Sequence, residues 1–564
     1  MPNLSLREKI GQLFVIGFYG EELSAEVEAF IEKNNIGFVI LFSRNISSIA
    51  QAAALNNHIH SLGKITPAVY TDQEGGLVVR FGEEAATVIS AMGLAATGDP
   101  GNARRAGRII GGEMSAIGID GVFAPVLDVN IEAGNPVIGI RAFSDDPGIV
   151  VTYARQFAAG LNEGGVAACG KHFPGHGGTT LDSHLEIPTA SLSRADFFRY
   201  CYAPFAELAR SNIESLMTAH VRFPNIDDGI ATFSSYFTRR LLREETGYRG
   251  VLFSDCLEMN AVKDNFTPAQ VVEFCMAGGI DVLCPSHTLA YQEELLQYLL
   301  FAVEKGLIPE QRVDESLARI LTLKQEFSSI PAEDAAVPSG KKVNKKFFAP
   351  RRGEASRGAA GADRVAATHP RRQVDPQQAE KSARGSIAGE REIAAKSITL
   401  LRNRLGIIPI EKEKKVLLVE WQVGRATTDF SGKKAVSLLA EIARSYLPNA
   451  DTEVLKTGAD FLVHLEAQLA EYDYIVACPY SLNRERELAQ AADIRRIIAV
   501  RPDVIAASTG NPYDILHFPE IDTYLVSYGA RQVQLEALFR VITGEIEPVG
   551  RLPVEIAGIF PRSG

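Results

Sequence analysis

Eight short apolar runs, each bounded by turn residues, recur along about the first 330 residues of this chain. Each run is too short for a helix and too continuously apolar for a strand with one face in water, which is typical of strands buried on both faces. The runs are Leu13–Phe18, Gly37–Phe42, Ala68–Asp72, Val122–Leu127, Val166–Lys171, Ser215–His220, Val251–Asp255 and Ile280–Cys284. Eight repeats over this length predict a (β/α)8 barrel and disfavour the alternative, a doubly wound open sheet.

Longer amphipathic segments with the apolar spacing of helices separate these runs. They include Ser24–Lys33, Ala103–Ile117, Ile149–Glu163 and Arg194–Arg210. After Ala395, strand-like runs return at Lys415–Trp421, Tyr472–Pro479, Val504–Ser508 and Thr523–Ser527, with helical segments at Lys434–Ala443 and Gln532–Ile542. This second part predicts a smaller α/β sandwich domain with a mostly parallel sheet.

The predicted organisation is a barrel over residues 1–330, a linker over 331–390 and a second domain over 391–564. Between Pro338 and Gly385, twelve Lys and Arg residues stand against four acidic ones, a local charge of +8 in a chain of net charge −11. This stretch lacks sustained apolar periodicity and cannot bury enough apolar surface to offset its ordering entropy. We expect a disordered basic spacer; a tether for an anionic surface is the less favoured alternative.

Composition excludes several functional classes. With 58 basic and 69 acidic residues, the chain lacks the excess of positive charge that proteins use to wrap nucleic acid. It has no run of about 18 apolar residues for a membrane span, and Met1–Lys9 lacks the apolar core of a signal peptide, so a cytoplasmic location is expected unless a leader was trimmed. The six cysteines form no C-x-x-C pair and predict buried thiols in a reducing compartment. No G-x-G-x-x-G or P-loop string occurs, no cofactor is expected, and the oligomeric state stays open.

Polar residues follow five of the predicted strands at the point where each strand ends. The strings begin at Asp72, Asp128, Lys171, Thr218 and Asp255. At a single strand end, a helix N-cap would be the simpler interpretation. The loops that follow the strands of a barrel form one rim, however, so five such ends together predict a polar pocket there.

The loop after the fifth strand holds three histidines, His172, His176 and His184. The first two have the i,i+4 spacing of a zinc-binding pair, but Pro174-Gly175 between them forbids a helix and the usual glutamate is absent. No metal site is therefore predicted. A serine hydrolase is also disfavoured, because Ser183 does not lie in a G-x-S-x-G turn.

In an extended segment Asp182 and His184 would point to the same side, so that the carboxylate could orient the imidazole as a general acid and base. A capped loop held by hydrogen bonds is the alternative. Asp255 ends an apolar strand and is the candidate nucleophile, with Glu258 as its rival three residues later. Retaining glycoside hydrolysis needs a carboxylate nucleophile beside a proton donor, and His184 could be that donor.

Five ordered motifs resemble those of glycoside hydrolase family 3, in its β-N-acetylglucosaminidase branch. They are Asp72-Gln73-Glu74-Gly75-Gly76, Phe123-Ala124-Pro125-Val126-Leu127-Asp128-Val129, Lys171-His172-Phe173-Pro174-Gly175-His176-Gly177, Asp182-Ser183-His184 and Ser254-Asp255-Cys256-Leu257-Glu258-Met259. The resemblance covers roughly residues 5–330 and continues at Lys396–Leu401 and Gly550–Val554, so it implies the two-domain form of the family.

The resemblance implies removal of terminal β-linked N-acetylglucosamine from cell-wall fragments or chito-oligosaccharides, with a carbohydrate as the partner. It makes Asp255 the nucleophile, His184 the acid/base and Asp182 its orienting partner. The implied contacts to sugar hydroxyls are Asp72, Arg80, Arg141, Lys171 and His172. Two departures, Leu77 in place of a common arginine and Cys256 in place of an acid, put the fine substrate preference in doubt.

Three other functions stay open at this point. A neutral histidine base repels phosphate less than a carboxylate would, so phosphorolysis of the same glycosides is one alternative. A β-glucosidase of the same family is another. A sugar-binding protein with an inactive site is the third, and the joint presence of Asp182, His184 and Asp255 speaks against it.

Overall fold

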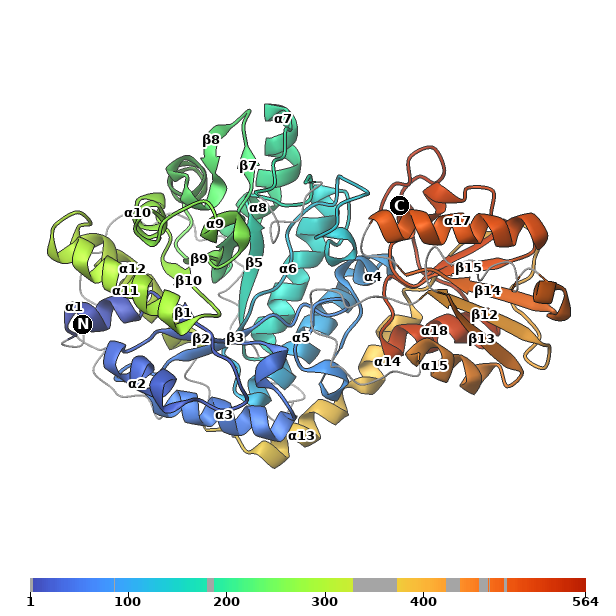
Figure 1. Ribbon diagram of the computed structural model, residues 1–564, viewed down its shortest axis with the longest axis horizontal. Helices are drawn as coiled ribbons and strands as arrows, with labels where there is room; N and C mark the ends of the chain where they lie inside the picture. The colour runs from blue at the N-terminus through green and yellow to red at the C-terminus, as the bar shows by residue number, and fades with distance from the viewer. Residues whose placement is uncertain are drawn as a thin grey trace.

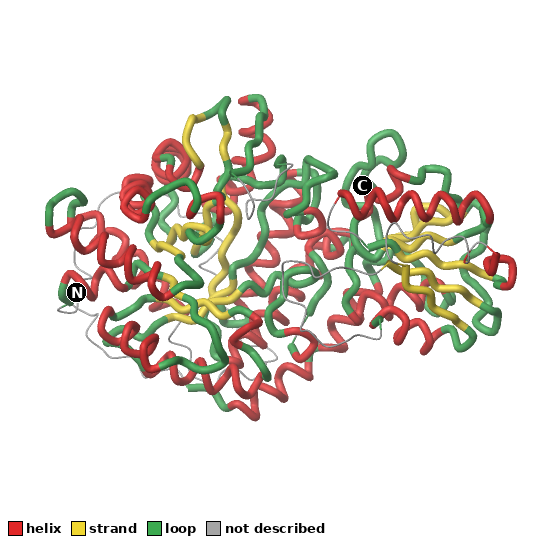
Figure 2. The backbone as a smooth tube through the Cα atoms, in the orientation of Figure 1, coloured by secondary structure: helices red, strands yellow, loops and turns green. Residues whose placement is uncertain are grey.

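The structure, a computed structural model, describes residues 4–85, 87–179, 187–327, 373–421, 437–455, 465, 467–480 and 484–563. It contains two domains, a barrel drawn in blue to green and a second domain drawn in orange to red (Figure 1). Coloured by secondary structure, each domain has its main sheet at the centre and helices around it (Figure 2). Both domains follow the alternating pattern of the sequence.

The first domain is a parallel eight-stranded barrel, as the sequence predicts. Its strands are β1 (Val15–Ile16), β2 (Phe38–Leu41), β3 (Ala68–Thr71), β4 (Gly121–Val122), β5 (Ala167–Phe173), β6 (Ser215–Thr218), β9 (Val251–Cys256) and β10 (Val282–Cys284). They pair in the order β1-β2-β3-β4-β5-β6-β9-β10. A parallel bridge between Phe14 and Leu283 closes the ring, where the Leu283 amide donates to the Leu13 carbonyl at 2.8 Å.

Four aromatic rings fill the interior of the barrel. Phe38, Tyr70, Phe123 and Phe253 contact one another with centroid separations of 5.1–5.6 Å, and all four are buried. Rings at these separations pack edge to face or tilted, which suits their quadrupoles. The barrel centre is therefore solid, and only the ends of the strands are left for chemistry.

Helices cover the outside of the barrel. They include α1 (Leu6–Gly11), α2 (Ala25–Asn34), α3 (Ile49–Ser61), α4 (Ala91–Ala96), α5 (Pro100–Ile117), α6 (Pro147–Glu163), α10 (Pro268–Gly278), α11 (Leu289–Glu304) and α12 (Glu310–Phe327). Asp99 and Asp146 cap α5 and α6, each followed by a proline at the first helical position. Across the described residues, no helix has the length and apolar composition that a membrane crossing requires.

One predicted helix is not uniform. The segment Arg194–Arg210 consists of a short turn α7 (Arg194–Asp196), a π-helical stretch Phe197–Tyr202 and α8 (Ala203–Arg210). A hairpin of β7 (Arg222–Phe223) and β8 (Asp227–Ile230) follows β6, and apolar periodicity did not predict it because most of its residues are partly or fully exposed.

The second domain is a six-stranded sheet between helices. Its strands are β11 (Thr399–Asn403), β12 (Val416–Trp421), β13 (Ala450–Leu455), β14 (Tyr474–Cys478), β15 (Ile505–Ser508) and β16 (Thr523–Val526). Their order is β11-β16-β15-β14-β12-β13, and only β11 is antiparallel to its neighbour. α17 (Arg484–Val500) covers one face, and α15 (Leu438–Tyr446) and α18 (Gln532–Ile542) cover the other (Figure 1).

The last part of the predicted linker is helical, which the sequence analysis did not expect. α13 (Pro376–Gly385) and α14 (Ile387–Ala395) run beneath the barrel toward the second domain (Figure 1). Ala379 and Ala383, one turn apart on α13, are buried, and Val374 exchanges two hydrogen bonds with the side chain of Asn57. A small apolar stripe is thus enough to dock this segment. Residues 328–372 lie outside the described residues, so the linker bounds stay a prediction.

Candidate active site

A cavity of about 460 Å³ opens at the carboxyl ends of the barrel strands. Six of the eight site residues that the sequence predicts line it, and they come from the ends or following loops of four different strands. They are Asp72, Arg80, Arg141, Lys171, His172 and Asp255. A site of this size, with convergent polar groups and walls of apolar side chains, is suited to one small ligand.

Two carboxylates and three cations form a connected network on one wall of the cavity. Lys171 Nζ, whose side chain is only 3% exposed, lies 2.7 Å from Asp72 Oδ1 and 2.6 Å from Glu74 Oε1. Arg80 donates to Asp72 at 3.2 Å, while Arg141 donates from Nε and Nη2 to the two oxygens of Glu74 at 2.9 and 2.8 Å. The bidentate geometry of Arg141 fixes the orientation of Glu74.

The charges of this network keep both carboxylates ionised. Burial alone would raise the pKa of Glu74, but Arg141 and Lys171 outweigh it and lower that pKa to about 2. The pKa of Asp72 is likewise lowered, because Lys171 and Arg80 overcome the effect of burial. The wall therefore offers both hydrogen-bond acceptors and donors, which is what recognition of neighbouring sugar hydroxyls requires.

His172 is held by Asp128. The imidazole Nδ1 lies 2.7 Å from Asp128 Oδ2, and the amides of His172 and His176 donate to the same carboxylate at 3.2 and 2.6 Å. Burial lowers the pKa of His176 to about 4, although Asp128 opposes this shift. His176 is therefore a neutral ring, and its Nδ1 lies 2.8 Å from the Thr179 hydroxyl.

Asp255 is the penultimate residue of β9 and lines the cavity with part of its side chain accessible. Its Oδ1 accepts a hydrogen bond from the Cys256 amide at 2.7 Å. The ion pairs recorded for the nearby cations Lys171 and Arg141 run to Asp72 and Glu74. The charge of Asp255 acts on His176 and His220. Burial lowers the pKa of both imidazoles, and the negative charge of Asp255 opposes that shift.

The carboxylate of Glu258, the alternative candidate nucleophile, binds backbone amides. Its Oε1 accepts from the amides of His287 and Thr288 at 2.7 and 2.9 Å, immediately before α11 begins. This arrangement satisfies free amides at a helix start. Glu258 lines the cavity as well, but its carboxylate is bound to the start of α11.

Asp182 and His184, the predicted acid/base pair, lie outside the described residues, which stop at Thr179 and resume at Ile187. The described part of the chain therefore fixes no distance from either side chain to Asp255. Their roles stay predictions from the sequence.

Sequence reasoning missed several residues that line the cavity. Glu74 lines the cavity and Asp128 holds the lining residue His172; both stood in the quoted strand-end strings but were not assigned to the site. Phe42, Arg44 and His287 also line the cavity: Phe42 stacks on His287 with centroids 5.1 Å apart, and the Arg44 guanidinium lies 4.3 Å from the Phe42 ring centroid. Their positions after β2 and β10 are the only sequence signal that would have found them.

Cys256, one of the two departures from the family pattern, also lines the cavity. The Ser286 hydroxyl donates to its sulfur at 3.0 Å, and burial raises the pKa of the thiol to about 11. Where an acid would add negative charge beside Asp255, this chain has a neutral thiol.

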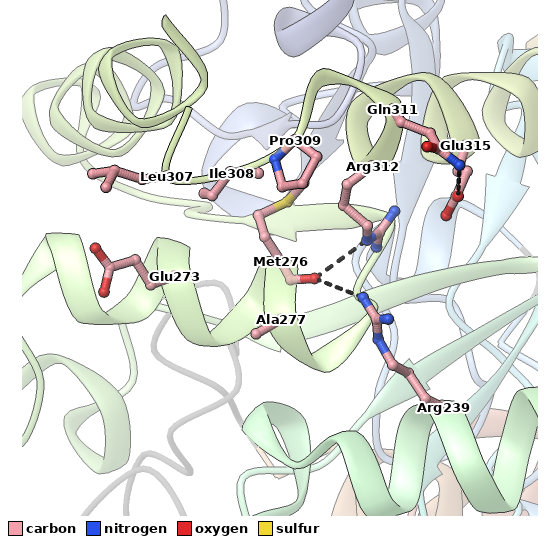
Figure 3. A pocket seen from close by; sticks show the side chains of 10 residues that line it. All are labelled: Arg239, Glu273, Met276, Ala277, Leu307, Ile308, Pro309, Gln311, Arg312 and Glu315. Atoms are coloured by element: carbon pink, nitrogen blue, oxygen red, sulfur yellow. Dashed lines mark hydrogen bonds between the residues drawn. The ribbon is translucent and has the colours of Figure 1, made fainter. Parts of the chain in front are cut away.

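A second hollow, of about 610 Å³, is lined by residues of α10 and α12 and of the turn before α12 (Figure 3). It sits beside the carboxyl end of α10 and the start of α12, next to the point where β10 begins. Arg312 is buried there and donates to the carbonyls of Met276 and Ile280 and to the Ser316 hydroxyl. These donors of Arg312 bind groups of the protein itself, which fits the stabilising role of this end of a barrel.

Comparison with known proteins places the chain among carbohydrate-active enzymes. The family described as Glycosyl hydrolase family 3 N terminal domain matches residues 5–323, and the one described as Glycosyl hydrolase family 3 C-terminal domain matches residues 398–558. A Beta-hexosaminidase of Alkalilimnicola ehrlichii is 40% identical over 276 residues, which are 48% of this chain and 79% of that relative.

Two solved structures resemble both domains. The glycoside hydrolase family 3 beta-N-acetylglucosaminidase from Paenibacillus sp. FPU-7 has a TM-score of 0.82 at 32% identity, and the match covers 99% of this chain and 100% of that one. A fungal multi-domain GH3 beta-N-acetylglucosaminidase has a TM-score of 0.85 at 27% identity, and this chain spans 62% of its length.

Proposed function

This chain belongs to glycosyl hydrolase family 3, and from that premise we propose that it is a retaining β-N-acetylhexosaminidase that removes terminal β-linked N-acetylglucosamine. One observation carries the proposal: Asp255 shares a single cavity with a wall of ionised Asp72 and Glu74 bound by Lys171 and Arg141. The hexosaminidase and beta-N-acetylglucosaminidase relatives support the choice of sugar.

The proposed reaction has two steps. Ionised Asp255 attacks the anomeric carbon, forming a glycosyl-aspartate as the glycosidic bond breaks, and His184 gives a proton to the leaving oxygen. His184 then takes a proton from water, whose oxygen displaces Asp255 and releases the sugar with its original configuration. Asp182 orients His184 in both steps.

The network of Asp72, Glu74 and their cations would bind the sugar in this reaction. Lys171 and the two arginines donate to hydroxyls, while Asp72 accepts from them. Such contacts accelerate the reaction where they strengthen as positive charge develops at the anomeric carbon. Because the network is already paired before substrate enters, little reorganisation is needed during the reaction.

The test compares 4-nitrophenyl N-acetyl-β-glucosaminide with the matching glucoside, each with and without phosphate. Turnover of the first, with free sugar as the product in phosphate buffer, supports the proposal. A preference for the glucoside would make the protein a β-glucosidase, and sugar-1-phosphate would make it a phosphorylase. Asp255→Asn should abolish release of the chromophore while Glu258→Gln retains it; the opposite result would overturn the nucleophile assignment.

The natural substrate and the location are finer parts of the same proposal. We propose terminal N-acetylglucosamine of peptidoglycan fragments or chito-oligosaccharides as the substrate and the cytoplasm as the place of action. The six free cysteines support a reducing compartment. Cell fractionation, with hydrolysis of chitobiose and of a muropeptide measured in each fraction, tests both parts.

A further inference from the structure

The loop between β3 and α4 carries three residues of the cavity wall, Asp72, Glu74 and Arg80, on the side that faces the barrel axis. Its other side contacts the second domain. We propose that the turn from Tyr528 to Arg531, at the end of β16, positions this loop and so sets the affinity for the sugar. Arg531 is then a positioning residue supplied by the second domain. The kinetic part of this inference rests on the proposed function.

Three polar contacts attach the loop to the second half of the chain. Arg531 donates from Nε to the Gly76 carbonyl at 2.8 Å, and Ser90 donates from its hydroxyl to the Tyr528 carbonyl at 2.6 Å. Between these two points, the Thr87 amide donates to Glu390 of α14 at 3.1 Å. The loop is thus held near both of its ends by the same turn.

The loop transmits this restraint because it is folded tightly on itself. The Gly76 amide donates to the Val88 carbonyl at 2.6 Å, and the Glu74 amide donates to the Val78 carbonyl at 2.9 Å. Gly76 has φ +57°, and a Cβ there would lie 2.5 Å from the Cα of Ser90. The segments around Gly76 and Ser90 are in close contact, so we expect a shift of Gly76 to move Glu74, two residues away.

The turn that holds the loop is itself in an unusual conformation. Tyr528 is buried and has φ +57°, a left-handed conformation that a bulky residue rarely adopts. Its hydroxyl donates to the Thr399 hydroxyl at 3.0 Å, and Ser527 donates from its hydroxyl to the Gly529 carbonyl at 2.8 Å. The surroundings therefore impose the conformation that directs the Tyr528 carbonyl at Ser90.

An apolar contact joins the same parts of the chain, where the hydrogen bonds of Ser90 and Thr87 are buried and that of Arg531 is part-buried. Met92 and Ala96 of α4 and Ile140, next to Arg141, are buried in one cluster with Leu552 and Val554 of the second domain. Hydrogen bonds in such an environment are stronger than exposed ones. The second domain thus contacts both segments that supply Glu74 and its partner Arg141.

The test compares Arg531→Ala, Arg531→Lys and a matched control, Arg391→Ala, in the full chain. Arg391 pairs with Glu536 at 2.7 Å within the second half of the chain, and neither of its recorded hydrogen bonds reaches the barrel. We expect Arg531→Ala to raise KM for 4-nitrophenyl N-acetyl-β-glucosaminide, and Ki for N-acetylglucosamine, by about tenfold, as for loss of a hydrogen bond from a charged donor. Because lysine keeps a single donor, Arg531→Lys should recover part of the loss.

Hydrogen exchange provides a readout that does not depend on the substrate. Peptides covering residues 73–81 should exchange faster in Arg531→Ala than in the parent or in Arg391→Ala. Unchanged exchange with KM within twofold of the parent would overturn the inference, as would equal effects in Arg391→Ala. If the parent does not cleave the chromogenic substrate, the proposed function fails, whereas the exchange result still decides whether Arg531 positions the loop.

Discussion

Asp128 accepts a 2.7 Å hydrogen bond from Nδ1 of His172, and this pair determines which nitrogen of the imidazole faces the cavity. Burial would raise the pKa of Asp128, but the charge and hydrogen bond of His172 lower it, so the carboxylate is ionised and can only accept. Nδ1 must therefore carry the proton. His172 Nε2 lies 3.5 Å from an Arg141 nitrogen, which can only donate, so the tautomer with its proton on Nδ1 presents a lone pair there.

Replacing Asp128 with asparagine should reverse this arrangement. An amide NH2 in place of Oδ2 favours the tautomer with the proton on Nε2, where it would oppose the Arg141 donor. We expect kcat/KM to fall by about a hundredfold or more, in line with other histidines whose orienting aspartate is made asparagine. Steady-state kinetics on 4-nitrophenyl N-acetyl-β-glucosaminide measure this change.

A second buried pair supplies the control. Asp120 accepts from His60 at 2.8 Å and from the Val69 amide at 2.8 Å, away from the residues that line the cavity. Asp120→Asn should lower stability while leaving KM near the parent value. Equal losses of kcat/KM in the two variants would show that Asp128 acts through stability alone.

Lys171→Met should make stability less sensitive to acid. Glu74 has its pKa lowered to about 2 from the usual 4.5, so its ion pairs contribute stability above pH 4.5 that is lost as the pH falls toward 2. Removing Lys171 leaves Asp72 and Glu74 buried with less positive charge, and we expect a loss of about 3–5 kcal/mol near neutral pH. Because the pKa of both carboxyls rises in the variant, the stability difference from the parent should shrink between pH 6 and pH 3.

Lys9 offers a matched comparison, because it also bridges two carboxylates, Glu310 and Asp314, each at 2.8 Å. These partners are 53% and 37% exposed, so Lys9→Met should cost only about 1 kcal/mol or less. Denaturant titrations of both variants at several pH values provide the measurement. A pH-independent difference for Lys171→Met would contradict the role assigned to the network.

The strands of both domains were predictable where they are buried on both faces. All eight barrel strands overlap the expected apolar runs, as do β12, β14, β15 and β16. The two strands missed in the second domain, β11 and β13, are the edges of its sheet. An edge strand such as Ala450–Leu455 is partly exposed and mixes Asp, Thr and Glu with apolar residues, so it lacks the continuous apolar pattern.

Six of the residues that line the cavity were predictable one by one, but their pairings were not. Strand ends pointed to Asp72, Lys171 and Asp255, because the loops of a barrel meet at one rim. Which partner each would take was not readable: Glu74 pairs with Arg141, 67 positions away, only because neighbouring strands bring their loops together. Contacts from the second domain, such as Arg531 on Gly76, depend on domain docking, for which the sequence carried no pattern.

Cys256 should resist alkylation although it lines the cavity. With a pKa of about 11, only about one thiol in a thousand is ionised at pH 8, and the thiolate is the reactive form. We expect iodoacetamide at pH 8 to inactivate the enzyme about a hundredfold more slowly than it consumes N-acetylcysteine in the same tube. Titration of all six thiols after unfolding serves as the control. Inactivation at the rate of the free thiol, with label on Cys256, would contradict the raised pKa.

Asp281→Asn should separate stability from catalysis, because Asp281 lies at the end of the barrel away from the cavity. It is fully buried and accepts from Arg243 at 2.6 Å, Arg319 at 2.8 Å and Ser316 at 2.8 Å. Burial would raise the pKa of Asp281, but these arginines lower it, so the substitution removes a charge that the cluster requires. We expect a loss of about 3–5 kcal/mol in stability.

Below its unfolding transition the Asp281→Asn variant should keep the parent kcat and KM, because none of the residues that bind Asp281 lines the cavity. Asp522→Asn, which breaks an exposed pair with Arg404 at 3.2 Å, is the control and should change stability by about 1 kcal/mol or less. Denaturant midpoints measure the change in stability, and steady-state kinetics on the same preparations measure kcat and KM. A tenfold change in KM for Asp281→Asn would mean that this end of the barrel is coupled to the sugar site after all.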